Sequence, residues 1–370
     1  MNSCIKCKGA QATVDIRFAV YCEYNLLLVL IYSECFQEQV YHKYRMTVAK
    51  ACSDHNDLAG PSKILLALSS GSASRLLLHF SQMARLKTPQ RPNLDEIHVA
   101  HILEPHETEE ETRDFCDPYK EHLASYSVVP LSRVLGRKNE AQKLNVLLQS
   151  CRTENSRECL LRILRFALLV KLADDLGCRL LYLGDTCSRM AVNIMVDTCE
   201  GRGMQLPWRF AQLQQIIPFS KFTFLLILPL EVRIVRPLRE IVDSEVKHYL
   251  QLKDPNWRHS NITLDESDPN TIYAATDSTK FPDFIFVGFV AELDAENSAT
   301  VSTVTRTTAK IQTVISDLRE WQPCALCLAP IDTTDKGLIC HGCRTIIDDM
   351  DIGEDLLSAL PSYTEAIFRK

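Results

Sequence analysis

The sequence has no apolar run long enough to cross a membrane, and it carries no excess of positive charge. Its two longest apolar runs lie near 19–32 and 222–230, and both fall short of the roughly 20 residues that span a bilayer. The first residues lack the charged-then-apolar layout of a signal peptide. The net charge of −6 excludes a polycation, so any contact with nucleic acid needs a local basic patch. We expect a soluble intracellular protein.

The composition is that of a folded protein with an unusual number of cysteines. Apolar residues make up 46% of the 370 residues and charged residues 24%, which is enough apolar material for a core. The length fits about two domains, or one large α/β domain with small attachments. Fifteen cysteines are many for a chain that is not expected to form disulfides. In a reducing compartment clustered cysteines more often bind metal, so their spacing is informative.

The clearest cysteine pattern lies near the C-terminus. Cys324 and Cys327 form one CxxC pair, Cys340 and Cys343 form a second, and twelve residues separate the pairs. Two pairs at this interval are typical of a tetrahedral zinc site with each pair on a turn. We expect Gly342 to give the second turn a positive φ. The alternatives are a metal-free loop and a redox pair.

A second cysteine group lies near the N-terminus and is less regular. Cys4 and Cys7 form a CxxC pair, whereas Cys22 and Cys35 lie further apart. Removing the apolar stretch 25–34 would give a second CxxC, so we interpret this stretch as an insertion. The group predicts a second zinc site in which Cys35 is the least regular ligand. The alternative is an incomplete site beside a buried strand or helix.

Between the two cysteine groups the apolar pattern alternates between strands and helices. Short apolar runs predict strands, and apolar residues three or four apart predict helices. The predicted strands are 63–69, 96–103, 127–131, 179–183 and 284–290. The predicted helices are 72–85, 108–126, 159–176, 186–200 and 297–321. This alternation is typical of βαβ units, so we expect an α/β domain with a doubly wound parallel sheet.

These patterns divide the chain into an N-terminal cysteine module at 1–60, the α/β domain at 61–320 and a C-terminal zinc ribbon-like module at 321–370. In such α/β domains ligands bind at the carboxyl ends of the strands. The first predicted strand runs into the small-residue turn Ser69–Ser74, whose backbone amides would suit a phosphate. The alternative is an ordinary turn that caps the following helix.

Several segments in this order resemble the cytoplasmic tRNA 2-thiolation protein 2 family. They are the N-terminal cysteine module, KILLALSSGSAS, YLGDTCSRMA, GRG at 201–203, VRPLRE at 235–240 and the C-terminal CxxC pairs. The resemblance covers nearly the whole chain and implies a PP-loop fold of the adenine nucleotide α-hydrolase type. The family is the partner of a PP-loop ATP pyrophosphatase that thiolates wobble uridine.

The resemblance also implies that the nucleotide loop is degenerate. An active PP-loop is expected to read SGGxDS, but here Ser70 replaces the first glycine and Ala73 replaces the aspartate. Ser69, Gly71 and Ser74 remain. The replaced aspartate would have been an expected ligand for magnesium.

Further motifs of the active relatives are incomplete. Gly184 is kept from a GHNxDD motif whose two acids are lost. Ser156 and Cys159 stand where active thiolating relatives carry both cysteines of a CxxC. After the VRPLRE segment no cysteine follows until Cys324. A sulfur relay between two thiols therefore lacks its pair.

By this resemblance the chain is a non-catalytic subunit of the complex that 2-thiolates wobble uridine in the cytosolic tRNAs for Lys, Glu and Gln. The implied partner is the catalytic thiolation subunit, which would bind ATP and accept sulfur from a ubiquitin-related sulfur carrier. The zinc sites would be structural. Because arginine binds phosphate bidentately, four arginines are candidates for tRNA contact. They are Arg202, Arg233, Arg236 and Arg239, and the alternative for each is a solvated or salt-bridged residue.

Two other functions stay open at this point. One is an active ATP-dependent tRNA sulfurtransferase that uses Cys159 or Cys187, which the missing aspartate and thiols argue against. The other is a zinc-stabilised adaptor for conjugating the sulfur carrier to proteins.

Overall fold

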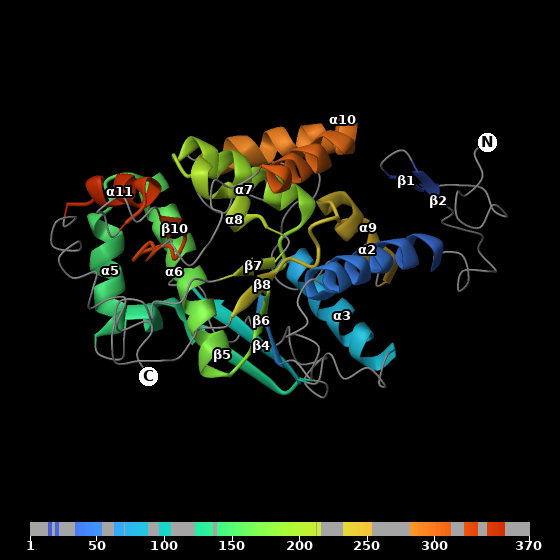
Figure 1. Cartoon of the computed structure of the whole chain (residues 1–370), viewed down its shortest axis with the longest axis horizontal. Helices are drawn as coiled ribbons and strands as arrows, with labels where there is room; N and C mark the ends of the chain where they lie inside the picture. The colour runs from blue at the N-terminus through green and yellow to red at the C-terminus, as the bar shows by residue number, and fades with distance from the viewer. Residues whose placement is uncertain are drawn as a thin grey trace.

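The computed structural model describes residues 14–16, 19–21, 34–53, 63–69, 71–87, 96–104, 123–135, 139–211, 213–215, 232–253, 282–311, 322–331 and 339–351. Its centre is a six-stranded sheet in the order β5-β4-β3-β6-β8-β7 (Figure 1). The strands are β3 (Lys63–Leu68), β4 (Glu96–Leu103), β5 (Ser125–Pro130), β6 (Leu180–Tyr182), β7 (Leu213–Gln215) and β8 (Arg233–Val235). All neighbours pair in parallel except β7, which is antiparallel to β8 at the edge. The predicted α/β fold with a parallel sheet is confirmed.

Helices surround this sheet, and two short hairpins lie outside it. The helices are α2 (Glu34–Ser53), α3 (Ser72–Lys87), α5 (Glu140–Ser150), α6 (Glu154–Asp175), α7 (Cys187–Cys199), α8 (Leu206–Arg209), α9 (Asp243–Lys253), α10 (Pro282–Lys310) and α11 (His341–Asp348), with 3-10 turns η3 (Leu131–Leu135) and η4 (Gly203–Gln205). The hairpins pair β1 (Val14–Ile16) with β2 (Ala19–Tyr21) and β9 (Gln322–Pro323) with β10 (Pro330–Ile331). In the part of the chain that the structure describes, no helix is both long and apolar enough to cross a membrane.

The central strands are buried on both faces. Ile64 and Leu66 of β3 belong to one core cluster with residues of α2, α3 and α9, whereas Leu65 belongs to a second cluster with residues of α6 and α11. Figure 1 shows these two groups of helices on opposite sides of the sheet. Burial on both faces is typical of parallel strands, and it explains why β3 reads as a continuous apolar run.

The strand order reverses direction at one point in the sheet, and this switch point lies between β3 and β6. From β3 the chain moves outward through β4 to β5, and after α6 it returns to pair β6 with the other side of β3. In sheets of this kind the carboxyl ends of two such strands open a crevice for ligands. The residues that follow Leu68 and Tyr182 are therefore the first candidates for a ligand-binding site.

The predicted strand at 284–290 is wrong, because this segment forms the start of α10. Its short apolar run does not distinguish a strand from a buried helix. Val290 and Val301 of α10 are buried in a cluster with Val192 and Val196 of α7. Figure 1 shows α10 lying along α7, and this contact accounts for the apolar residues.

Two predicted helices also differ from the structure at their ends. The helix predicted at 108–126 runs too far, since Ser125 and Tyr126 belong to β5, and 108–122 lie outside the described residues. The helix predicted at 297–321 corresponds to the second half of α10, and 312–321 lie outside the described residues.

The C-terminal cysteine segment shares its core with the α/β domain. Leu326, Leu328, Ile346 and Ile347 are buried in the same cluster as the apolar side of α6. The division of the chain at 60 and 320 stays a prediction, but the C-terminal segment is packed against the sheet domain rather than separate from it.

The burial of β6 generates a stability prediction. Leu181 is fully buried in β6, whereas Leu86 near the end of α3 is 61% exposed. We expect Leu181→Ala to lower the free energy of unfolding by about 2–5 kcal/mol. Leu86→Ala removes the same atoms from a solvated position, so its effect should stay within about 0.5 kcal/mol. Urea denaturation followed by circular dichroism compares the two, and equal losses would contradict the burial of β6.

Candidate functional site

The switch-point loop, residues 69–74, joins β3 to α3 and is hydrogen-bonded within itself. The Ser74 hydroxyl lies 2.8 Å from the carbonyl oxygen of Gly71 and 3.1 Å from the hydroxyl of Ser69. The Gly71 N–H donates to the Ser69 hydroxyl over 3.4 Å. Ser70 lies outside the described residues. The hydroxyls of Ser69 and Ser74 are therefore used inside the loop.

Gly184, which follows β6, lies against the N-terminus of α3. A methyl group at this position would come within 3.3 Å of Ser74 Cα and 3.4 Å of Ser74 N. Glycine lets the two backbones approach this closely. The structure thus brings Gly184 together with Ser69, Gly71 and Ser74 at the carboxyl edge, as the sequence predicts, although their role in nucleotide binding stays a prediction.

The carboxylate that follows Gly184 is engaged by a buried arginine. Arg236 Nε donates to Asp185 Oδ2 over 3.0 Å, and the guanidinium lies 5.8 Å from the centre of the Phe210 ring. Burial lowers the pKa of Arg236, while Asp185 favours its charged form. Sequence reasoning missed Asp185 as a partner. The signal was available, because the residues that follow two neighbouring parallel strands must meet at one edge of the sheet.

The four predicted tRNA-contacting arginines do not form one surface. Arg202 and Arg239 are buried like Arg236, and Arg239 Nη2 donates to the carbonyl of Phe210 over 3.2 Å. Arg233 is partly exposed, but it begins β8 and so lies at the opposite end of the strand from Arg236. Arg202, Arg236 and Arg239 are buried against protein, and tRNA contact by any of the four stays a prediction.

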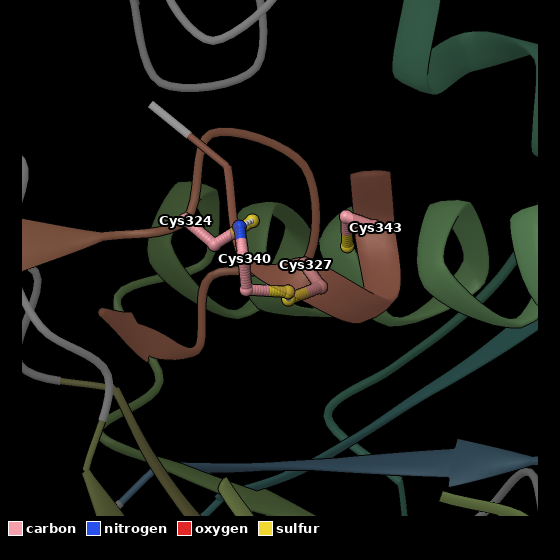
Figure 2. A group of neighbouring side chains, drawn as sticks. All are labelled: Cys324, Cys327, Cys340 and Cys343. Atoms are coloured by element: carbon pink, nitrogen blue, oxygen red, sulfur yellow. Dashed lines mark hydrogen bonds between the residues drawn. The ribbon is translucent and has the colours of Figure 1, made fainter. Parts of the chain in front are cut away.

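The four C-terminal cysteines come together as predicted (Figure 2). Cys324, Cys327, Cys340 and Cys343 are buried, and their sulfur atoms all lie within 4.8 Å of one another. The sulfurs of Cys327 and Cys340 are 3.7 Å apart. Zinc–sulfur bonds of about 2.3 Å in a tetrahedron place sulfurs about 3.8 Å apart. The donor set and its spacing therefore fit one tetrahedral metal ion, which we call the cysteine cluster site.

Local backbone geometry builds this site from two turns. Leu328 has a φ of 64°, and its N–H donates to the carbonyl of Cys324 over 3.0 Å, which closes the turn between β9 and β10. Cys340 precedes α11, and its N–H donates to Cys324 Sγ over 3.3 Å. Backbone N–H groups aimed at ligand sulfurs orient them for a metal.

The expected positive φ at Gly342 is wrong. Among the described glycines, positive φ values occur at Gly177 and Gly201. Gly342 is needed for space instead, because a methyl group there would lie 2.4 Å from Arg202 Cγ.

The four sulfurs of the cysteine cluster site shift one another's pKa values in opposite directions. Contacts with Cys324, Cys327 and Cys343 lower the pKa of Cys340 far below that of a free thiol. Contacts with the other three sulfurs, together with burial, raise the pKa of Cys343. Metal binding to such a set requires the remaining protons to leave.

The N-terminal cysteine group lies largely outside the described residues. Cys4, Cys7 and Cys22 are not among them, and neither is the greater part of the proposed insertion, 25–33. Cys35 is described and lies partly buried near the start of α2. The N-terminal zinc site stays a prediction.

The two cysteines named for a sulfur-transfer alternative are both buried. Cys159 lies on α6 and donates to Glu200 Oε1. Cys187 begins α7, with its sulfur 3.5 Å from the hydroxyl of Thr305. Each is engaged with the protein interior rather than paired with a second thiol.

Comparison with known sequences identifies relatives over most of the chain. The family model of cytoplasmic tRNA 2-thiolation protein 2 matches residues 285–339. Proteins of that name from Danio rerio and Phaeosphaeria nodorum are 26% and 22% identical, each over 92% of this chain, and the matches cover 74% and 87% of those proteins. One from Dictyostelium discoideum is 25% identical over 62% of this chain, which spans only 42% of that relative's length.

A solved structure has the same fold. The U34-tRNA thiolase NcsA from Methanococcus maripaludis, solved with its [4Fe-4S] cluster, matches with a TM-score of 0.54 over 85% of this chain and 91% of that chain. The sequence identity is 17%, so the likeness concerns the fold alone. It confirms the predicted PP-loop type of α/β fold.

The cysteine cluster site generates a prediction about metal content. Cys343→Ser removes one buried ligand, so we expect the variant to bind about one metal ion fewer per chain and to melt at a lower temperature. Cys199→Ser replaces an exposed cysteine at the end of α7 and should change neither value. Elemental analysis and thermal unfolding of the purified proteins measure both. Unchanged metal content and an unchanged melting temperature in Cys343→Ser would contradict a four-cysteine metal site.

Proposed function

We propose that this chain, which is similar to cytoplasmic tRNA 2-thiolation protein 2 over most of its length, is a non-catalytic subunit of the complex that 2-thiolates wobble uridine in tRNA. It forms a heterodimer with a catalytic PP-loop subunit in the cytoplasm. The substrates are the tRNAs for Lys, Glu and Gln, and a ubiquitin-related carrier supplies the sulfur. ATP binds to the partner subunit.

The ion pair between Asp185 and Arg236 is the observation that most supports a non-catalytic role. Magnesium in nucleotide sites is held by one or two carboxylates together with the phosphates. Asp185 lies beside the switch-point loop, but its carboxylate is bound by a buried arginine at 3.0 Å. In the loop itself, Ala73 has no carboxylate to offer. A carboxylate with this partner is a poor magnesium ligand.

The internal hydrogen bonds of the switch-point loop support the same role. The hydroxyls of Ser69 and Ser74 bond to one another and to the loop backbone, and Gly184 packs against the start of α3. A phosphate would have to displace these contacts before it reached the backbone amides. The loop therefore serves to join β3 to α3, and the fold is kept as architecture for the complex.

Among the arginine candidates for tRNA contact, Arg233 is the best placed. Its side chain is partly exposed, whereas Arg202, Arg236 and Arg239 are buried against protein. A buried guanidinium would need a conformational change before it could bind a phosphate, so these three are less suited to direct tRNA contact.

Zinc is the metal that we propose for the cysteine cluster site, in a structural role. Four buried thiolates around one ion are typical of structural zinc. Four cysteines can also hold an iron–sulfur cluster, which absorbs visible light whereas zinc does not. Iron and sulfide in place of zinc in the purified protein would replace this assignment.

Reconstituted thiolation tests the non-catalytic role. The double variant Ser69→Ala/Gly71→Ala alters the switch-point loop on its exposed side. We expect it to form the heterodimer and to support 2-thiouridine formation within about twofold of the wild type, because the loop binds no reacting nucleotide. Product is measured by mass spectrometry of digested tRNA, and gel filtration checks the heterodimer.

The opposite result is informative as well. If the loop variant formed an intact heterodimer but abolished thiolation, the loop would have to bind a nucleotide, and the non-catalytic assignment would be wrong.

A further inference from the structure

Arg202, just beyond the end of α7, packs directly on the turn that carries Cys340 and Cys343. Its side chain is 1% exposed. Arg202 Nη2 donates to the carbonyl of Gly342 over 3.2 Å, and a methyl group on Gly342 would lie 2.4 Å from Arg202 Cγ and 2.8 Å from Nε. The second CxxC turn is thus shaped to accept this one side chain.

The same guanidinium belongs to a buried ion network at the end of α7. Arg202 pairs with Glu200 and lies 3.7 Å from Asp197, which is fully buried. Arg162 of α6 reaches Glu200 at 2.9 Å and Asp197 at 3.4 Å, and Arg209 reaches Asp197 at 3.0 Å. Among the described residues, these ion pairs join three arginines to two carboxylates, so this group of five side chains has an excess of positive charge beside the cysteines.

This excess charge has the sign that a metal–thiolate centre needs nearby. A divalent ion with four thiolates carries two net negative charges, and burying such a centre without a counter-charge is costly. Arg202 is close enough to Cys343 for the two to interact electrostatically. Its charge and its hydrogen bond to Gly342 act on the same turn.

We propose that Arg202 is a positioning residue for the cysteine cluster site, where it offsets the charge of the metal–thiolate centre and ties it to the ion network at the end of α7. This rests on the proposed metal at that site. Groups outside the ligand shell commonly change metal affinity by about 10- to 100-fold. Because linkage is reciprocal, metal binding also stabilises the segment 197–209.

Metal affinity of the folded full chain tests this role. Zinc binding is measured by chelator competition, in a background of Cys4→Ser and Cys7→Ser that removes the predicted N-terminal site from the count. We expect Arg202→Met to weaken zinc binding by at least about 10-fold. Arg202→Lys keeps the positive charge but loses the planar guanidinium and its several N–H donors, so we expect it to weaken zinc binding less. Circular dichroism checks that each variant is folded.

Arg344→Met is the matched control. Arg344 directly follows Cys343 on α11, but its side chain is 53% exposed and pairs with Asp348 at the surface. We expect its zinc affinity to stay within about twofold of the background protein. An equal loss in Arg344→Met and Arg202→Met would overturn the specific role of Arg202.

A double-mutant cycle keeps the test decisive if Arg202→Met is poorly folded. Gly342→Ala should weaken zinc binding in the background protein, because its methyl group displaces Arg202, and should weaken it less when Arg202→Ala, which removes the clashing Cγ and Nε, is already present. Additive effects would contradict the contact as the cause. Hydrogen exchange of 197–209 should also rise on zinc removal, and unchanged exchange would contradict the linkage.

Failure of the metal site and failure of this role are distinguishable. If the background protein binds no zinc, the proposed metal is wrong. If it binds zinc and the Arg202 variants bind equally well, the metal stands and the role of Arg202 is wrong.

Discussion

The parallel pairing of β3 with β6 is the constraint on which the rest of this structure depends. The register aligns Ile64 with Leu180 and Leu66 with Tyr182, so the two strands end at the same edge of the sheet. Their following loops must then meet, and Gly184 lets them do so by leaving room for the start of α3. Both faces of this strand pair are buried in core clusters. The packing of these clusters, rather than the loops themselves, therefore determines where the two loops meet.

At this edge an ion pair occupies a carboxylate that could otherwise bind a metal ion, and two arginines contact Phe210. Asp185 is bound by Arg236, Arg236 lies over Phe210, and Arg239 bonds to the backbone of Phe210. Burial lowers the pKa of both arginines, so their charges must be compensated within the protein. The pairing of Asp185 with Arg236 is therefore the feature of this edge that bears most directly on the proposed non-catalytic role.

The sequence predicted the elements with strong periodicity and missed those defined by tertiary contacts. The apolar runs of β3 and β4 were sufficient because both faces of these strands are buried, and the helical spacing of α6 and α7 was sufficient because their buried residues recur at the helical period. The strand predicted at 284–290 failed because an apolar run beside α7 suits a buried helix as well. The three-residue strand β8 was too short for its pattern to be recognised.

The candidate site residues also divide into those that local sequence patterns predict and those that depend on tertiary contacts. CxxC spacing predicted the cysteine cluster, because four ligands for one ion impose a local rule on the sequence. The contact of Arg202 with Gly342 joins residues 140 positions apart, and nothing in either local sequence indicates it. The burial of Arg236 and Arg239 was hidden for the same reason, since an arginine in a loop reads as a surface residue until its packing is known.

The most direct measurement is uridine adenylation and pyrophosphate release by the purified chain alone, incubated with ATP, magnesium and substrate tRNA. The account predicts no pyrophosphate above background from this chain, and product only when the catalytic subunit is added. Adenylated tRNA formed by the isolated chain, and lost in the Ser69→Ala/Gly71→Ala variant, would contradict it.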